Sequence, residues 1–255
     1  MPETALDTAI HSLQVRFGSQ ALTRAAALPA PLPWPTGMEA VDRMSGIGGL
    51  PRGRLAVLVG AGSCGKLSLG LALLAAATRE FAQAVVIDPQ KSFDPWALLP
   101  LRPEWGALTV VRPPDPASFG ESALALARAG AGFLLVLGLL PESALESLEP
   151  NTSRSGTVVV AVVEATRPAL AHASSLSLGL EPAGWIHERG QLVGLRARMR
   201  CLKNRVAAPL GMAELEVRYP LGASRFLVPI TLPSGETLVP LPSGEGREGL
   251  WSSAG

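Results

Sequence analysis

The strongest constraint on the fold is a series of short, continuously apolar segments separated by helical stretches. These segments occupy residues 54–60, 84–88, 108–112, 133–137 and 157–163. Strands that are apolar on both faces are typical of parallel sheets with helices packed on each side. Helical periodicity lies between the segments, at 66–81 and 119–129. We therefore predict an α/β fold built on a mostly parallel sheet.

The chain changes character after residue 174, where the helical periodicity stops. Segments 175–181, 191–205 and 213–219 have the composition of strands. We predict that they extend one edge of the sheet as antiparallel strands. Residues 223–255 are rich in turn-forming residues, and we expect a hairpin around 233–236 followed by a flexible tail.

The N-terminal segment has the pattern of a separate helical arm. Apolar residues share one stripe of a helix predicted over 4–17, and Gly18 would end it; they are Leu6, Ile10, Leu13 and Phe17. Four prolines follow in residues 25–36. A lone helix of this length is marginal in water, so we expect it to bury its stripe on a neighbouring protomer or on its own domain. The predicted organisation is an arm at 1–24, a Pro-rich linker at 25–36, a core at 37–222 and the C-terminal segment at 223–255.

Composition excludes several classes of protein. The 255 residues carry a net charge of +1, so any basic site must be local. Two cysteines and three histidines lack the spacing of a metal site. The N-terminus lacks the pattern of a signal peptide, and the apolar stretch 129–141 is too short to span a bilayer. We expect a cytoplasmic protein with no membrane partner.

A glycine-rich loop between the first strand and the first long helix is the main candidate binding site. Glycines allow backbone N–H groups to turn toward an anion, and the following helix N-terminus adds positive potential. The lysine of such a loop reaches the β- and γ-phosphates of a nucleotide. The expected phosphate-binding residues are Gly60, Gly62, Ser63, Gly65 and Lys66. The alternative is a glycine-rich turn without a ligand.

The position after the lysine argues against a bound metal. A phosphate-binding loop has serine or threonine there to hold Mg²⁺, whereas this chain has Leu67. Ser68 is rotated by about 100° around the helix and is a poor substitute. A leucine at this position is expected where the helix is buried and no metal has to be bound.

Several segments together resemble the RecA recombinase family over residues 5–222. The similar stretches include WPTGMEAVDRMSGIGGLPRGRLAVLVG at 34–60, VVIDPQKSFDP at 85–95 and GLRARMRCLKNRVAAPLGMAELEVRY at 194–219. The resemblance implies a RecA-like P-loop core that binds ATP. It also implies that residues 5–24 are the helix with which family members dock on the next protomer of a filament.

The resemblance implies a degenerate catalytic site. Gln90 falls at the position of the family's glutamate that activates the attacking water, and an amide cannot accept that proton. Gly138 falls at the position of the Walker B aspartate, and Leu67 replaces the metal-binding hydroxyl. With no metal ligand and no base among these positions, hydrolysis by the family's mechanism is not expected, and no residue is assigned as catalytic.

Other family positions keep suitable residues. Asp94 falls at the family's adenine contact, although it equally suits a turn cap before Pro95. Lys203 and Arg205 match the basic pair that reaches across to a neighbour's nucleotide. Glu164 falls where the family has a glutamine that senses the γ-phosphate, and a carboxylate there would repel phosphate.

Binding of DNA has weaker support. Arg196, Arg198 and Arg200 share one face of a predicted strand, where they would either follow the phosphates of single-stranded DNA or form a solvated face. Both DNA-binding loops of the family correspond to short segments, within 138–156 and directly after Glu164.

Three functions remain open at this stage. The first is a non-hydrolysing RecA-like accessory protein in the DNA damage response, similar to ImuA-type proteins that assist translesion polymerases. The second is an active DNA-dependent ATPase and recombinase. The third is a regulator that binds ATP without cleaving it.

Overall fold

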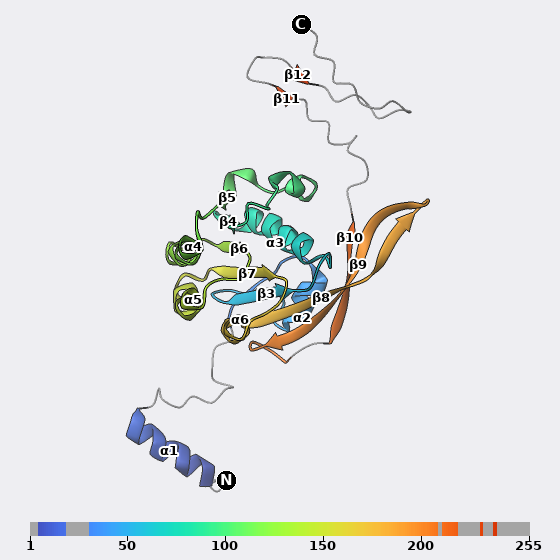
Figure 1. The fold of residues 1–255 in the computed structure, drawn as a ribbon. Helices are drawn as coiled ribbons and strands as arrows, with labels where there is room; N and C mark the ends of the chain where they lie inside the picture. Colours follow the sequence, from blue (N-terminus) through green and yellow to red (C-terminus); the bar gives the residue numbers. More distant parts are fainter. Residues whose placement is uncertain (1–4, 19–30, 209–210, 219–229, 232–236, 239–255) are drawn as a thin grey trace.

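The computed structural model describes residues 5–18, 31–208, 211–218, 230–231 and 237–238. Within these residues an eight-stranded sheet forms the centre, in the order β10-β9-β8-β3-β7-β6-β4-β5 (Figure 1). Its strands are β3 (Leu55–Val59), β4 (Ala84–Ile87), β5 (Leu108–Val111), β6 (Phe133–Leu137), β7 (Val158–Val163), β8 (Leu176–Glu188), β9 (Gln191–Asn204) and β10 (Met212–Arg218). The predicted α/β class with a mostly parallel sheet is confirmed.

Strand β8 differs from the prediction. Its first residues pair in parallel with β3, Ala56 opposite Leu176, so only β9 and β10 extend the sheet as antiparallel strands. The reason is the connection from β7, which passes through helix α6 (Pro168–Ala173) before the chain returns to the sheet on the far side of β3. A helical crossover of this kind joins parallel strands.

Helices cover both faces of the parallel strands, as Figure 1 shows. On one face lie α2 (Glu39–Ser45) and α3 (Lys66–Glu80), and on the other lie α4 (Pro116–Arg128), α5 (Glu142–Ser155) and α6. Successive strand residues point to opposite faces, so Leu58 packs with α3 whereas Val57 packs on the side of α4–α6. Both cores therefore depend on the same continuously apolar strands.

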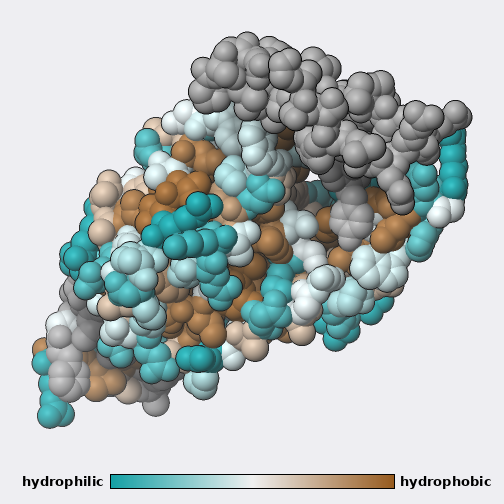
Figure 2. Space-filling view, turned by 45° about the horizontal axis from the view of Figure 1, so that its top comes forward, coloured by the Kyte–Doolittle hydropathy of each residue, from teal (hydrophilic) through white to brown (hydrophobic). Residues whose placement is uncertain are grey.

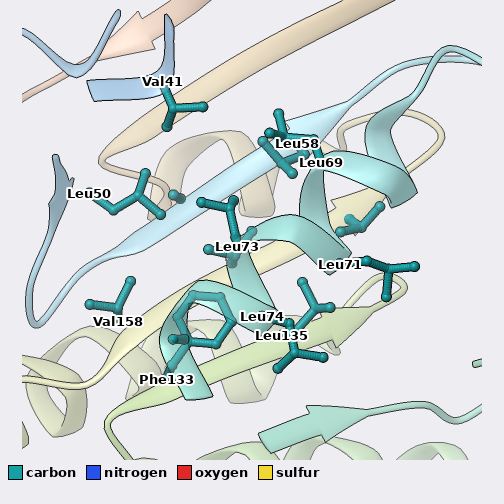
Figure 3. Packing of buried hydrophobic residues seen from close by; sticks show 14 of the residues in the cluster. Val41, Leu50, Leu58, Leu69, Leu71, Leu73, Leu74, Phe133, Leu135 and Val158 are labelled. Carbon is teal, nitrogen blue, oxygen red and sulfur yellow. The ribbon is translucent and has the colours of Figure 1, made fainter. Parts of the chain in front are cut away.

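The core beneath α3 is the larger of the two clusters in the described chain. Leucines of α3 share one buried cluster with residues of β3 and β6. In Figure 3, Leu69 lies beside Leu58 of β3, and Leu74 lies near Leu135 and Phe133 of β6. Burial of each such side chain contributes about 1.5–3 kcal/mol, which fixes α3 firmly on the sheet. The start of α3, and with it the glycine-rich loop, is positioned by this packing.

The N-terminal helix is confirmed as α1 (Ala5–Phe17), which lies apart from the sheet (Figure 1). Gly18 follows it with φ +93° and donates its N–H to Gln14. The side chains of Leu6 and Phe17 are outside the described part of the chain. The docking of the predicted stripe thus stays a prediction.

The last residues of the predicted linker belong to the core. Strand β1 (Pro33–Trp34) pairs with β2 (Leu50–Pro51), and Trp34 is buried against Phe81 and Phe133. A buried tryptophan in aromatic contact holds this segment on the sheet. The arm's connection therefore ends before residue 33.

Some elements were not predicted from the sequence. Helices α5 and α6 occupy the two segments expected to be short loops, and 3₁₀ turns η2 (Pro95–Leu101) and η3 (Trp105–Ala107) follow β4. At the C-terminal end, β11 (Ile230–Thr231) pairs with β12 (Thr237–Leu238), on either side of the expected hairpin turn. The turn at 233–236 and the tail from 239 lie outside the described residues.

The surface mixes apolar and hydrophilic residues. On the face drawn in Figure 2, apolar residues reach the surface between hydrophilic ones. Elsewhere in the described chain, Trp96 and Trp105 of the two 3₁₀ turns are exposed aromatic side chains. No helix in the described part of the chain is long and apolar enough to cross a membrane.

Candidate functional site

A cleft of about 1020 Å³ opens at the carboxyl edge of the parallel strands. Its walls come from the glycine-rich loop and the start of α3, the segment after β4, the start of α4, and the ends of β6 and β7. Clefts at this edge of an α/β sheet are the usual place for a ligand. Of the predicted site residues, it is lined by Gly62, Ser63, Gly65, Lys66, Leu67, Ser68, Gln90 and Gly138.

The backbone of the glycine-rich loop is fixed by packing. Gly60 donates its N–H to Val163, and a Cβ at Gly60 would lie 2.3 Å from the carbonyl oxygen of Leu180. Gly65 has φ +86° and precedes the first residue of α3, while Cys64 is buried beneath the loop. The loop therefore has the predicted course from strand to helix, and two of its glycines are required by close approach or by a positive φ.

The lysine of the loop is held by a carboxylate. The ammonium of Lys66 lies 2.6 Å from Oε1 of Glu164 and donates to the carbonyl oxygen of Gly62 at 2.8 Å. Oε2 of Glu164 accepts the N–H of Gly62 at 2.8 Å. The hydrogen bond from Lys66, followed by that from Gly62, holds the pKa of Glu164 below its usual range. We call this arrangement the Lys66–Glu164 bridge.

Sequence reasoning did not find this bridge, although it placed Glu164 at a strand end. The two residues are far apart in sequence, but β3 and β7 are neighbouring parallel strands with Val59 opposite Val163. The loop and Glu164 follow directly after that pair. Knowledge of the strand order would have been enough to bring them together.

The positions at which the family holds its metal ion and catalytic base carry no suitable side chains in this cleft. Leu67 is 42% exposed and lines the cleft, so the expectation of a buried leucine is wrong. Gly138, at φ +133°, presents no side chain, and Gln90 is an exposed amide. The described residues contain no cluster of three or more side chains suited to a metal ion. The side chains at the family's metal positions do not fit Mg²⁺.

Neighbouring carboxylates have structural partners. Asp88 is buried at the end of β4 and accepts the N–H groups of Ser92 and Phe93 at 3.1 and 2.8 Å. Asp94 caps η2 by accepting the N–H of Trp96 at 2.9 Å. Asp94 is not among the described residues that line the cleft. This cap favours the role of Asp94 as a turn cap over its role as an adenine contact.

The basic pair Lys203 and Arg205 lies near the amino ends of the parallel strands, whereas the loop lies at their carboxyl ends. Asn204, between the two residues, pairs with Leu176 and so lies level with Ala56 near the start of β3, whereas the loop follows the end of β3. Lys203 donates to the carbonyl oxygens of Ala171 and His172 in the last turn of α6. Burial, and then the charge of Arg205, lower the pKa of Lys203. The chain does not bring Lys203 and Arg205 to its own loop.

The three arginines of β9 share one face, as their spacing predicts, and each has an acidic partner. Arg196 pairs with Glu216 of β10 at 3.2 Å. Arg198 and Arg200 both pair with Glu181 of β8, at 3.2 and 2.8 Å. Opposite charges directly across adjacent strands support a sheet. The arrangement suits a solvated, charge-compensated face better than a basic stripe.

Comparison with known proteins gives one consistent result. The RecA N-terminal domain family matches residues 4–145. Protein RecA of Chlorobium chlorochromatii is 29% identical over 265 residues, covering 86% of this chain and 74% of that protein. Protein RecA of Caldanaerobacter subterraneus subsp. tengcongensis is 28% identical, covering 88% and 77%, and that of Aquifex pyrophilus is 28% identical, covering 87% and 76%. With its P-loop core and mostly parallel sheet, the chain belongs to the RecA family.

Proposed function

We propose that the chain is a non-hydrolysing member of the RecA family that acts as an accessory protein in DNA repair, through protein partners. The observation that carries this proposal is the cleft itself. The phosphate loop keeps its backbone course, yet Leu67, Gln90 and Gly138 supply neither a metal ligand nor a base. Phosphoryl transfer relies on positioned charge and metal, so positioning by the loop alone is insufficient for turnover.

The donor groups of the loop support a role for nucleotide as a ligand. Lys66 and the N–H of Gly62 are the donor types that hold a triphosphate, although both are engaged by Glu164. When bound, ATP would place its phosphates on these donors without being cleaved. A regulator that responds to nucleotide is therefore a second form of the same proposal.

The proposed partners are other RecA-family protomers and a translesion polymerase, on single-stranded DNA. Helix α1 supports a docking role because Leu13, a member of its predicted apolar stripe, is exposed. Removal of residues 1–24 should lower the mass measured by light scattering if the arm joins protomers. An unchanged mass and an unchanged melting temperature would exclude docking through the arm.

The function is tested by phosphate release in the presence of Mg²⁺ and single-stranded DNA. The wild-type chain should release phosphate at the background rate, the same as a Lys66→Ala variant. DNA-stimulated release that disappears in Lys66→Ala would overturn the proposal in favour of an active ATPase of the recombinase type.

A further inference from the structure

We propose that Glu164 is an internal anion that occupies the phosphate-binding donors of the loop and keeps nucleotide out until its carboxylate is displaced. The proposal deepens the proposed function and rests on it. It concerns binding alone, whereas the proposed function concerns turnover.

The geometry of the Lys66–Glu164 bridge carries the proposal. Each oxygen of the carboxylate meets a different donor of the loop, Lys66 at 2.6 Å and the N–H of Gly62 at 2.8 Å. These are the two kinds of donor, an ammonium and a backbone N–H, with which such loops hold phosphate oxygens. A carboxylate and a phosphate oxygen cannot both occupy these positions.

The backbone delivers the carboxylate to this place. Glu164 directly follows Val163, which accepts the N–H of Gly60 and pairs with Val59. The loop glycine and the carboxylate are therefore held at neighbouring strand ends by the sheet itself. No rearrangement of the core is needed to form the bridge.

Charge and exposure make the bridge a competitor that a ligand can displace. The side chain of Lys66 is only 11% exposed, so its ammonium depends on a partner in the cleft, while Glu164 is 69% exposed and can turn into solvent. A triphosphate must separate the pair and would then lie close to a like charge. The apparent affinity is then the intrinsic affinity multiplied by the fraction of molecules in which the Lys66–Glu164 bridge is open.

The test is a titration of a fluorescent ATP analogue in EDTA against the wild-type chain and three variants. Glu164→Gln should bind at least about ten-fold more tightly than wild type, a gain of about 1.4 kcal/mol. The control Glu146→Gln removes the same charge from the exposed side of α5 and should leave the affinity at the wild-type value. Adding Lys66→Ala to Glu164→Gln should abolish the gain. Equal affinity of wild type and Glu164→Gln would overturn the proposal.

A second measurement guards against loss of folding and separates the two proposals. Inorganic triphosphate should raise the melting temperature of Glu164→Gln and Glu164→Ala more than that of wild type, because a ligand of the native state stabilises it. Equal shifts in all three proteins would overturn the internal-anion proposal while leaving the absence of turnover intact. Phosphate release by wild type would contradict the proposed function whatever the titration shows.

Discussion

The two halves of the cleft lie at the same end of the parallel strands, but only one of them keeps the features of a nucleotide site. The donor half, formed by β3 and the loop up to Lys66, keeps the course of a phosphate-binding loop, and a Cβ at Gly60 would collide with Leu180. The other half holds Leu67 and Gln90, which are exposed and can change without disturbing the core. Packing explains the difference: geometry that the fold requires persists, while side chains that serve only chemistry are free to be replaced.

The largest effect on stability should come from adding a side chain at Gly60. Gly60→Ala places a Cβ 2.3 Å from the carbonyl oxygen of Leu180 and 2.5 Å from Sγ of Cys64. Overpacking of this kind costs about 1–3 kcal/mol, and we expect the free energy of unfolding to fall by an amount near the upper limit of that range. The control Gly106→Ala meets its nearest atom at 3.7 Å and should change stability by less than about 0.5 kcal/mol. Urea unfolding measures both. Equal stability of the two variants would show that packing does not fix the loop.

Restoring the family's aspartate and hydroxyl in the other half of the cleft should lower stability by unequal amounts. Gly138→Asp forces an aspartate to φ +133° and should lower stability by about 1–3 kcal/mol. Leu67→Thr changes an exposed residue and should stay within about 0.5 kcal/mol of wild type. Thermal unfolding compares them. If both variants are as stable as wild type, backbone strain does not oppose the return of the aspartate.

A smaller effect is expected on the charge-compensated face of β9. Replacing Arg196, Arg198 and Arg200 together by glutamine should cost about 0.2–1 kcal/mol for each ion pair removed, because all three pairs are solvent-exposed. The affinity for single-stranded DNA and its dependence on salt should stay unchanged. A log–log salt slope that weakens by about 2 in the variant would instead identify the face as a phosphate-binding stripe.

The smallest effect concerns the pH dependence of the Lys66–Glu164 bridge. The pKa of Glu164 is lowered in the folded chain, so the bridge stabilises the fold above the carboxyl's ordinary pKa and loses that contribution as the pH falls through the lowered value. Wild type should melt slightly above Glu164→Gln at pH 7, and the two should converge in acid. A difference that grows in acid would have the wrong sign for this bridge.

The parallel part of the fold could be predicted because its signals are local. Continuous apolar runs mark the buried strands β3, β4, β6 and β7, whereas the run at 108–112 became the partly exposed edge strand β5. A glycine-rich loop between strand and helix has its own pattern. Helix α5 escaped prediction because Pro150 and the polar residues around it hide its periodicity. Its buried residues, Ala144, Leu145, Leu148 and Thr152, became recognisable only with the sheet in place.

The backbone of the candidate site could be predicted from the sequence, but the ion pairs of its side chains could not. The sequence identified Gly60 to Lys66 as the loop, but the partner of Lys66 depends on which strands are neighbours. The same holds for the arginines of β9, whose partners Glu181 and Glu216 are set by the register of β8 and β10. Long-range ion pairs follow from topology, which the local pattern does not specify.

The central claim is that the donor half of the cleft can hold an anion while the other half holds no metal. The most direct test is the affinity of Glu164→Gln for a fluorescent ATP analogue, measured in Mg²⁺ and again in EDTA. We predict dissociation constants that agree within about two-fold, since Leu67 and Gly138 offer no side-chain oxygen to the ion. Tightening by Mg²⁺ of about ten-fold or more, equivalent to about 1.4 kcal/mol, would contradict the account.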